Sequence, residues 1–110
     1  MRVIFEIGVG QCGKRYGLEE ITLEHRSNMM DAAIDYVSRK FGGCFVSHGS
    51  GAWIQDGKIV REPSITITVD NISNSTSESE LRIIADTLRS MFRQDSVIMT
   101  TVNASTFYAE

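Results

Sequence analysis

The order of strand-like and helix-like segments constrains this chain of 110 residues more than any other feature of its sequence. Two segments repeat apolar residues at the spacing of an amphipathic helix, and four others have the composition or the alternation of β-strands. The two helical segments are separated by a pair of strand-like segments with a tight turn between them. Such an order favours an antiparallel sheet with helices packed against it.

The first strand-like segment covers residues 3–9, where Val3, Phe5 and Ile7 recur at a period of two. This alternation predicts a half-buried strand. Glycines interrupt the polar stretch that follows, so we expect a flexible loop there. These glycines are Gly8, Gly10, Gly13 and Gly17.

Two helices are predicted, over residues 27–41 and about 77–93. Apolar residues of the first segment recur at helical spacing, and Gly42-Gly43 supplies the left-handed stop that ends many helices. At the start of the second segment, Ser77 and Glu80 form a capping box, in which each side chain satisfies a backbone donor near the other residue.

Residues 44–54 and 59–69 are predicted to form two strands of a hairpin. Asp56-Gly57 lies between them, and this dipeptide tolerates the positive φ angles of a tight turn. Pro63 falls within the second strand, where it cannot donate a ladder hydrogen bond. We therefore expect either a β-bulge or a sheet edge at Pro63.

A last strand is predicted over residues 97–102, and residues 103–110 either extend it or detach from it. The complete order, β-α-β-β-α-β, predicts an α+β fold of the ferredoxin-like kind, with one domain over residues 1–110 and both helices on one face of the sheet. The other face is left uncovered and carries apolar side chains, which favours pairing with a second copy as a homo-oligomer. Those side chains are Ile4, Ile98 and Val102.

The charge of the chain argues against duplex nucleic acid as a partner. The formal net charge is −3 with a pI near 5.3, and Lys and Arg are scattered along the sequence. No apolar stretch is long enough to span a membrane, and the first residues lack the pattern of a signal peptide. We therefore expect a cytoplasmic protein, in the host cytoplasm if a phage encodes it, with Cys12 and Cys44 as free thiols.

Three patterns suggest chemistry but lack the context that it needs. Gly8 to Gly13 matches the dinucleotide fingerprint G-x-G-x-x-G, yet residues 14–17 continue the loop instead of opening a helix. The cysteines and histidines are not in the closely spaced pairs of a structural zinc site; Cys44 is expected in the core and Cys12 in the loop. His48-Gly49-Ser50 has no evident orienting carboxylate. We expect no catalytic residue, no metal and no cofactor.

The hairpin is the most distinctive segment, because it carries the single tryptophan, Trp53, near Arg61. Trp53 offers a surface on which a ring can stack, and the guanidinium of Arg61 offers a fork that suits phosphate. The alternative is that Trp53 fills the core and Arg61 pairs with a surface carboxylate. The sequence leaves both interpretations open.

This part of the chain resembles a group of small uncharacterised bacterial and phage proteins, over roughly residues 41–100. Their pattern runs GG, GxGxW, DG, EPS and QxSV, and it appears here as Gly42-Gly43, Gly49 to Trp53, Asp56-Gly57, Glu62-Pro63-Ser64 and Gln94 to Val97. The resemblance implies a ferredoxin-like fold and adds no catalytic residue. Small phage proteins of similar build, including the first type of Thoeris anti-defence protein, resemble oligomeric sponges that sequester nucleotide immune signals.

We therefore predict a non-catalytic homo-oligomer, not an enzyme, that binds a small anionic ligand, such as a cyclic nucleotide or related immune signal, and sequesters it. One alternative is a small ferredoxin-like enzyme with His48 or His25 as general base, and another is a protein-protein adaptor or inhibitor. Aromatic side chains would stack on a base, basic ones would meet phosphates, and an asparagine would read a base edge. The predicted ligand-binding residues are Lys14, Arg15, Tyr16, Arg26, Trp53, Arg61, Asn103, Phe107 and Tyr108.

Overall fold

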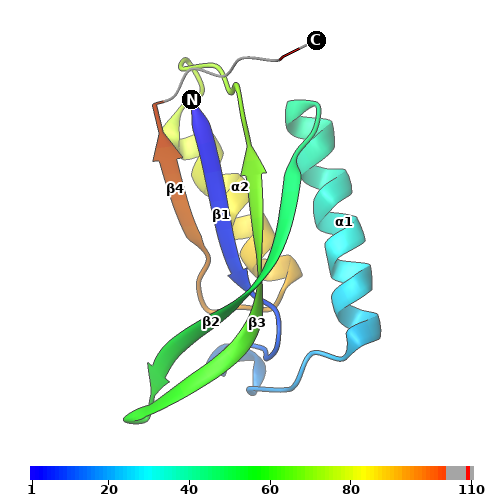
Figure 1. Cartoon of the computed structure of the whole chain (residues 1–110), viewed down its shortest axis with the longest axis vertical. Helices are drawn as coiled ribbons and strands as arrows, with labels where there is room; N and C mark the ends of the chain where they lie inside the picture. The colour runs from blue at the N-terminus through cyan, green and yellow to red at the C-terminus, as the bar shows by residue number, and fades with distance from the viewer. Residues whose placement is uncertain (104–108, 110) are drawn as a thin grey trace.

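The computed structural model describes residues 1–103 and residue 109, and its main feature is a four-stranded antiparallel sheet with two long helices (Figure 1). The elements are β1 (Arg2–Gly8), the short 3-10 helix η1 (Lys14–Tyr16), α1 (Leu23–Phe41), β2 (Phe45–Gln55), β3 (Lys58–Val69), α2 (Glu78–Met91) and β4 (Ile98–Val102). The strand order is β2-β3-β1-β4, with antiparallel pairing throughout. This arrangement confirms the predicted ferredoxin-like α+β fold.

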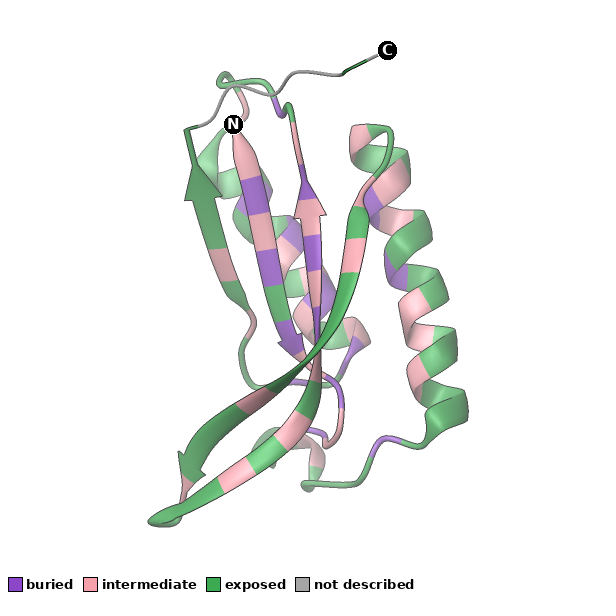
Figure 2. Ribbon diagram, in the orientation of Figure 1, coloured by how far each residue is buried: buried purple, intermediate pink, exposed green. Residues whose placement is uncertain are grey.

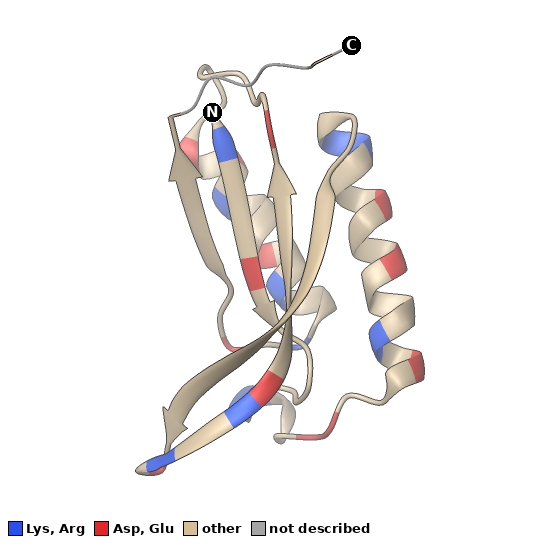
Figure 3. Cartoon of the chain, viewed as in Figure 1, with Lys and Arg blue, Asp and Glu red and all other residues tan. Residues whose placement is uncertain are grey.

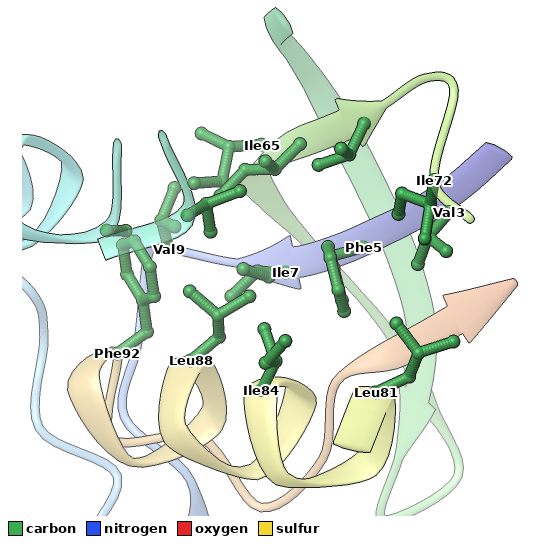
Figure 4. Close-up of a cluster of buried hydrophobic side chains, with 14 residues drawn as sticks. Val3, Phe5, Ile7, Val9, Ile65, Ile72, Leu81, Ile84, Leu88 and Phe92 are labelled. Atoms are coloured by element: carbon green, nitrogen blue, oxygen red, sulfur yellow. The ribbon is translucent and has the colours of Figure 1, made fainter. Parts of the chain in front are cut away.

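The hydrophobic core lies between the sheet and the two helices (Figure 4). Val3, Phe5 and Ile7 of β1 are almost fully buried, as their alternation predicts, and the neighbouring positions of the strand are more exposed (Figure 2). Burying each such side chain stabilises the fold by about 1.5–3 kcal/mol. The other elements contribute Ile65, Ile67 and Val69 from β3, Ala33 and Val37 from α1, and Leu81, Ile84 and Leu88 from α2.

The two helices begin at residues with capping side chains. The Oγ of Ser77 accepts a hydrogen bond from the backbone N–H of Glu80 at 3.2 Å, which confirms the predicted start of α2. The prediction for α1 is wrong by a turn, because the helix begins at Leu23 and not at residue 27. Thr22 caps it through its Oγ1, while Leu23 is 76% exposed, so the apolar pattern begins later than the helix does.

The hairpin of β2 and β3 extends beyond the end of β1 as a twisted arm (Figure 1). Its register is unbroken from Phe45 to Gln55, so Pro63 is not at a bulge. Pairing of β3 with β1 ends at Ser64, and Pro63 lies just past that end, where its carbonyl accepts from Val9 N–H at 2.9 Å. The edge interpretation of Pro63 is the one that the structure bears out.

The sheet face opposite the helices is uncovered, and it faces the viewer in Figure 1 with α2 behind it. Phe45 is 70% exposed and Ile98 is 57% exposed, and the register places them on the same face as Ile4 and Glu6. The predicted apolar character of this face is therefore present in the structure. Among the described residues, no helix is long and apolar enough to cross a membrane.

Candidate functional site

A hollow of about 390 Å³ opens where the arm of the hairpin leaves the sheet. Its lining comes from β1, the glycine-rich loop after β1, both strands of the hairpin, the segment between α2 and β4, and the first residue of β4. We call this cavity the Trp53 hollow. Its aromatic and polar lining side chains are Glu6, Gln11, Lys14, Trp53, Gln55, Asp56, Glu62, Gln94, Asp95 and Ser96.

The indole of Trp53 forms one wall and lies across two glycines. A Cβ placed on Gly51 would lie 2.5 Å from the Cη2 and Cζ3 atoms of the indole, and one on Gly8 would lie 3.2 Å from Cζ2. The ring therefore occupies the space that side chains at these two positions would fill. Trp53 is 40% exposed and lies outside the core cluster, so the interpretation of Trp53 as a core residue is wrong.

Glu62 lies beside the indole and holds the start of the glycine-rich loop. Its Oε2 accepts hydrogen bonds from the backbone N–H groups of Gly10 and Gln11 at 3.1 and 3.0 Å. Its Oε1 is turned toward Gly8, the same glycine that the indole covers. Among the described residues this second oxygen accepts no hydrogen bond, which leaves it available to a ligand.

Asp95 holds the other end of the loop. Its Oδ2 accepts from Lys14 N–H at 2.6 Å, and its Oδ1 accepts from Arg15 N–H at 3.3 Å and also forms a salt bridge with the Arg15 side chain. The bond from the Lys14 backbone is the main reason that the pKa of Asp95 is lowered. A Cβ on Gly13 would lie 2.5 Å from the Asp95 side chain, so this approach needs glycine.

Gln94 is a buried polar residue beneath the same loop. Its side-chain amide donates to the carbonyl of Gln11 at 2.8 Å and to that of Phe92 at 3.0 Å. With Glu62 and Asp95, it fixes the loop from both sides. The loop that was predicted to be flexible therefore makes defined contacts, in which carboxylates accept from four of its backbone donors and an amide donates to one of its carbonyls.

The charge of the hollow is mostly negative. Among the described residues, the acids Glu6, Asp56, Glu62 and Asp95 line it, and Lys14 is the one basic residue in the lining. Asp95 is already paired with Arg15, but the others still make an acidic surface beside an aromatic ring. Such a surface suits a ligand with a positive charge and a flat ring better than the anionic ligand that we predicted.

Of the predicted ligand-binding residues that the structure describes, Trp53 and Lys14 line this hollow. Arg26 and Arg61 line a different cavity, and the hydroxyl of Tyr16 accepts from Arg89 instead. Arg15 pairs with Asp95, and Asn103 is exposed beyond the end of β4. Phe107 and Tyr108, the last two predicted residues, lie outside the described residues.

Sequence reasoning missed the acidic residues of the hollow. Glu6 lies between apolar residues of β1, whose other charged residue is Arg2 at the start of the strand (Figure 3), and an acid in that position is a signal of an exposed functional face. Glu62 and Gln94 belong to the EPS and QxSV parts of the pattern that resembles other small proteins, yet they were not among the predicted site residues. Their roles depend on contacts with a loop that is far away in the sequence, which no local pattern shows.

The structure also places the cysteines and histidines of the chain. Cys12 lies in the glycine-rich loop, as expected, and it is buried and lines the hollow. Cys44 is half-buried and packs against the core cluster, which agrees with its expected position. Both thiols are free. His25 and His48 are exposed and line none of the cavities described here, and the described residues contain no cluster of side chains that could hold a metal ion.

The sequence matches no protein-family model and no curated protein sequence. Solved structures do match in fold. A phage SAM lyase in the apo state is 19% identical, with a TM-score of 0.63 over 89% of this chain and 75% of that one. The same enzyme in complex with S-methyl-5'-thioadenosine is 18% identical, with a TM-score of 0.60 over 89% of this chain and 76% of that one. CutA1 from Pyrococcus horikoshii OT3 is 10% identical, with a TM-score of 0.56 over 96% of this chain and 87% of that one.

These likenesses agree with the ferredoxin-like fold, and they contradict the predicted function. A phage SAM lyase is an enzyme, so the expectation of a non-catalytic protein that only sequesters its ligand is wrong, and the alternative of a small enzyme is better supported. The phage source of this neighbour fits the phage part of the resemblance drawn from the sequence. None of the three comparisons supports the hypothesis of a sponge or the resemblance based on the pattern from GG to QxSV.

Proposed function

We propose that this protein is a small lyase that acts on S-adenosyl methionine (SAM) in the Trp53 hollow. The observation that carries the proposal is the pairing of an exposed indole with an acidic lining, in a fold that a phage SAM lyase shares. SAM has a flat adenine ring, a positive sulfonium and an amino-acid end. Each of these parts has a chemical counterpart among the side chains of the hollow.

The indole of Trp53 offers a face for the adenine ring or for the sulfonium, through stacking or cation–π attraction. The free Oε1 of Glu62 lies beside that ring, and Glu6 adds a second carboxylate from the neighbouring strand. Both favour the positively charged ligand over its neutral analogues. The Lys14 ammonium is then the partner for the carboxylate at the amino-acid end of the ligand.

The reaction that fits is loss of S-methyl-5'-thioadenosine without addition of water. The bond between the sulfonium sulfur and the γ-carbon of the amino-acid part breaks, and its electron pair stays on sulfur as a neutral thioether. The carboxylate oxygen of the same ligand forms the new bond to the γ-carbon, which leaves a lactone. This step needs no base and no cofactor, because orientation of one part of the ligand against another supplies most of the acceleration.

The carboxylates of the hollow contribute to binding more than to the chemical step, since the positive charge that attracts them is lost as the bond breaks. The rigid loop contributes orientation. Glu62 and Asp95 hold the loop that carries Lys14, and so they fix where the amino-acid end of the ligand is held.

We also propose that a second copy of the chain covers the uncovered sheet face and with it part of the hollow. Ile98 belongs to both surfaces, because it lines the hollow and is 57% exposed on that face. Covering it would exclude water from the ligand and strengthen the electrostatic contacts around it. The protein would work in the cytoplasm, where free thiols such as Cys12 and Cys44 persist.

The proposal is tested by SAM-induced thermal shift and by release of S-methyl-5'-thioadenosine from the purified chain. Glu62→Gln should weaken SAM binding and so lower turnover about tenfold or more at SAM concentrations below KM, because it removes a charge next to the ligand. Asp31→Asn is the matched control, since Asp31 is an exposed acid on α1 away from the hollow. A wild-type chain that neither shifts nor turns over SAM would contradict the proposal, as would equal turnover by the two variants.

A further inference from the structure

A second cavity of about 370 Å³ borders the loop and is lined by two arginines that form no salt bridge among the described residues. We call it the arginine hollow; its lining includes Glu20, Arg26, Val60, Arg61 and Pro63, and it shares Gln11, Leu18 and Glu62 with the Trp53 hollow. Most arginines of this chain are paired: Arg2, Arg15, Arg39, Arg82 and Arg89 each form a salt bridge with an aspartate or glutamate.

Within residues 1–103, neither Arg26 nor Arg61 forms a salt bridge. Arg26 is half-buried and held in place, because its Nε donates to the carbonyl of Val9 at 3.2 Å. The N–H of Val9 in turn donates to the carbonyl of Pro63, two residues from Arg61. This bond fixes the root of the Arg26 guanidinium against the strand that carries Arg61 and leaves its terminal nitrogens as free donors.

Two carboxylates also belong to this cavity, and among the described residues neither forms a salt bridge with the arginines. Glu62 accepts the backbone N–H groups of Gly10 and Gln11 through Oε2, and its Oε1 is turned toward Gly8. Glu20 is exposed at the rim and forms no salt bridge among the described residues. Arg26 and Arg61 thus line one cavity together with the apolar residues Leu18, Val60 and Pro63.

We propose that the arginine hollow binds a phosphate dianion, either free or as the phosphate group of a larger ligand. Two guanidinium forks match a tetrahedral dianion, because each presents parallel N–H donors, while a single carboxylate would satisfy only one of them. The proposed phosphate site does not depend on the lyase reaction, so measurements of phosphate binding alone test it.

Titration of the full chain with inorganic phosphate, followed by backbone amide NMR shifts, tests the proposal. The shifts should concentrate at Leu18, Arg26 and Arg61, and acetate at the same concentration should produce much weaker ones. Arg61→Ala should weaken phosphate binding about tenfold, because it removes charge-assisted hydrogen bonds. Arg39→Ala, which removes a paired arginine on α1, is the matched control and should leave binding unchanged.

Glu20→Gln gives the opposite expectation, since loss of the rim carboxylate removes a repulsion and should tighten phosphate binding about two- to fivefold. Arg26→Ala would also remove the hydrogen bond to the Val9 carbonyl, so this variant is not used as a test. Arg61→Ala and Glu20→Gln test the proposal instead. Their thermal melts report whether each variant is folded. Phosphate binding that is unaffected by Arg61→Ala, acetate binding of equal strength, or no binding at millimolar phosphate would each overturn the proposal.

Discussion

Gly51→Ala should weaken SAM binding while the fold stays intact. The new methyl group would lie 2.5 Å from two atoms of the Trp53 ring, so the indole must swing away from the wall of the hollow. Because that ring is 40% exposed, it can move into solvent without opening the core. Replacing a strand glycine with alanine also reduces the entropy lost on folding, by about 0.5–1 kcal/mol, so the free energy of unfolding should not fall.

The loss in binding follows from the stack that the indole would make. A ring stacked on an aromatic side chain contributes about 1–3 kcal/mol, so the dissociation constant for SAM should rise by about 5- to 150-fold. Trp53 is the only tryptophan in the chain, so its fluorescence reports on the site directly. Quenching of this emission by SAM measures the wild-type affinity, and calorimetry measures that of the variant.

Gly49→Ala is the matched control, because Gly49 lies two residues earlier on the same face of β2. A Cβ there would meet only the Oγ of Ser64, at an ordinary contact distance of 3.5 Å. This variant should bind SAM as the wild type does. If both variants bind with the same affinity as the wild type, the indole is not part of the site, and if Gly51→Ala unfolds the chain, the ring supports the fold instead.

Other expectations concern stability. Trp53→Ala should lower the melting temperature far less than Phe92→Ala, which empties a fully buried site and should cost about 3–5 kcal/mol by urea unfolding. Asp95 has a lowered pKa in the folded chain because of the hydrogen bond from Lys14, so its contribution is present above the ordinary pKa of 3.8 and is lost as the pH falls through the folded value. Asp95→Asn should flatten the acid side of the stability profile, and an unchanged profile would refute this assignment. Thr22→Ala should cost about 1 kcal/mol, and no loss in thermal melts would show that this cap does not matter.

The sequence predicts the fold well because the fold depends on local periodicity. The alternation of Val3, Phe5 and Ile7 and the cap at Ser77 are local signals, and each matches the structure. The start of α1 was missed since its first turn is exposed, and an exposed turn carries no apolar pattern. The loop was expected to be flexible because glycine alone does not reveal the carboxylates that hold it.

The candidate site could not be predicted to the same extent, because its residues meet only in the folded chain. Basic and aromatic residues were taken together as one anion site, but the structure separates Trp53 from Arg26 and Arg61. The register pairs Trp53 with Val60 and Ala52 with Arg61, so the alternation of faces turns Arg61 away from Trp53, whereas Glu62 lines both cavities. Sequence spacing alone does not say which of Arg61 and Glu62 shares a cavity with the indole.

The most direct measurement is the mass of the products after the purified chain is incubated with SAM that carries an isotope in its S-methyl group. We expect labelled S-methyl-5'-thioadenosine and an equal amount of the unlabelled lactone from the amino-acid part. Trp53→Ala should release far less of both. Intact SAM after prolonged incubation, or a label transferred to another acceptor, would contradict the proposed lyase.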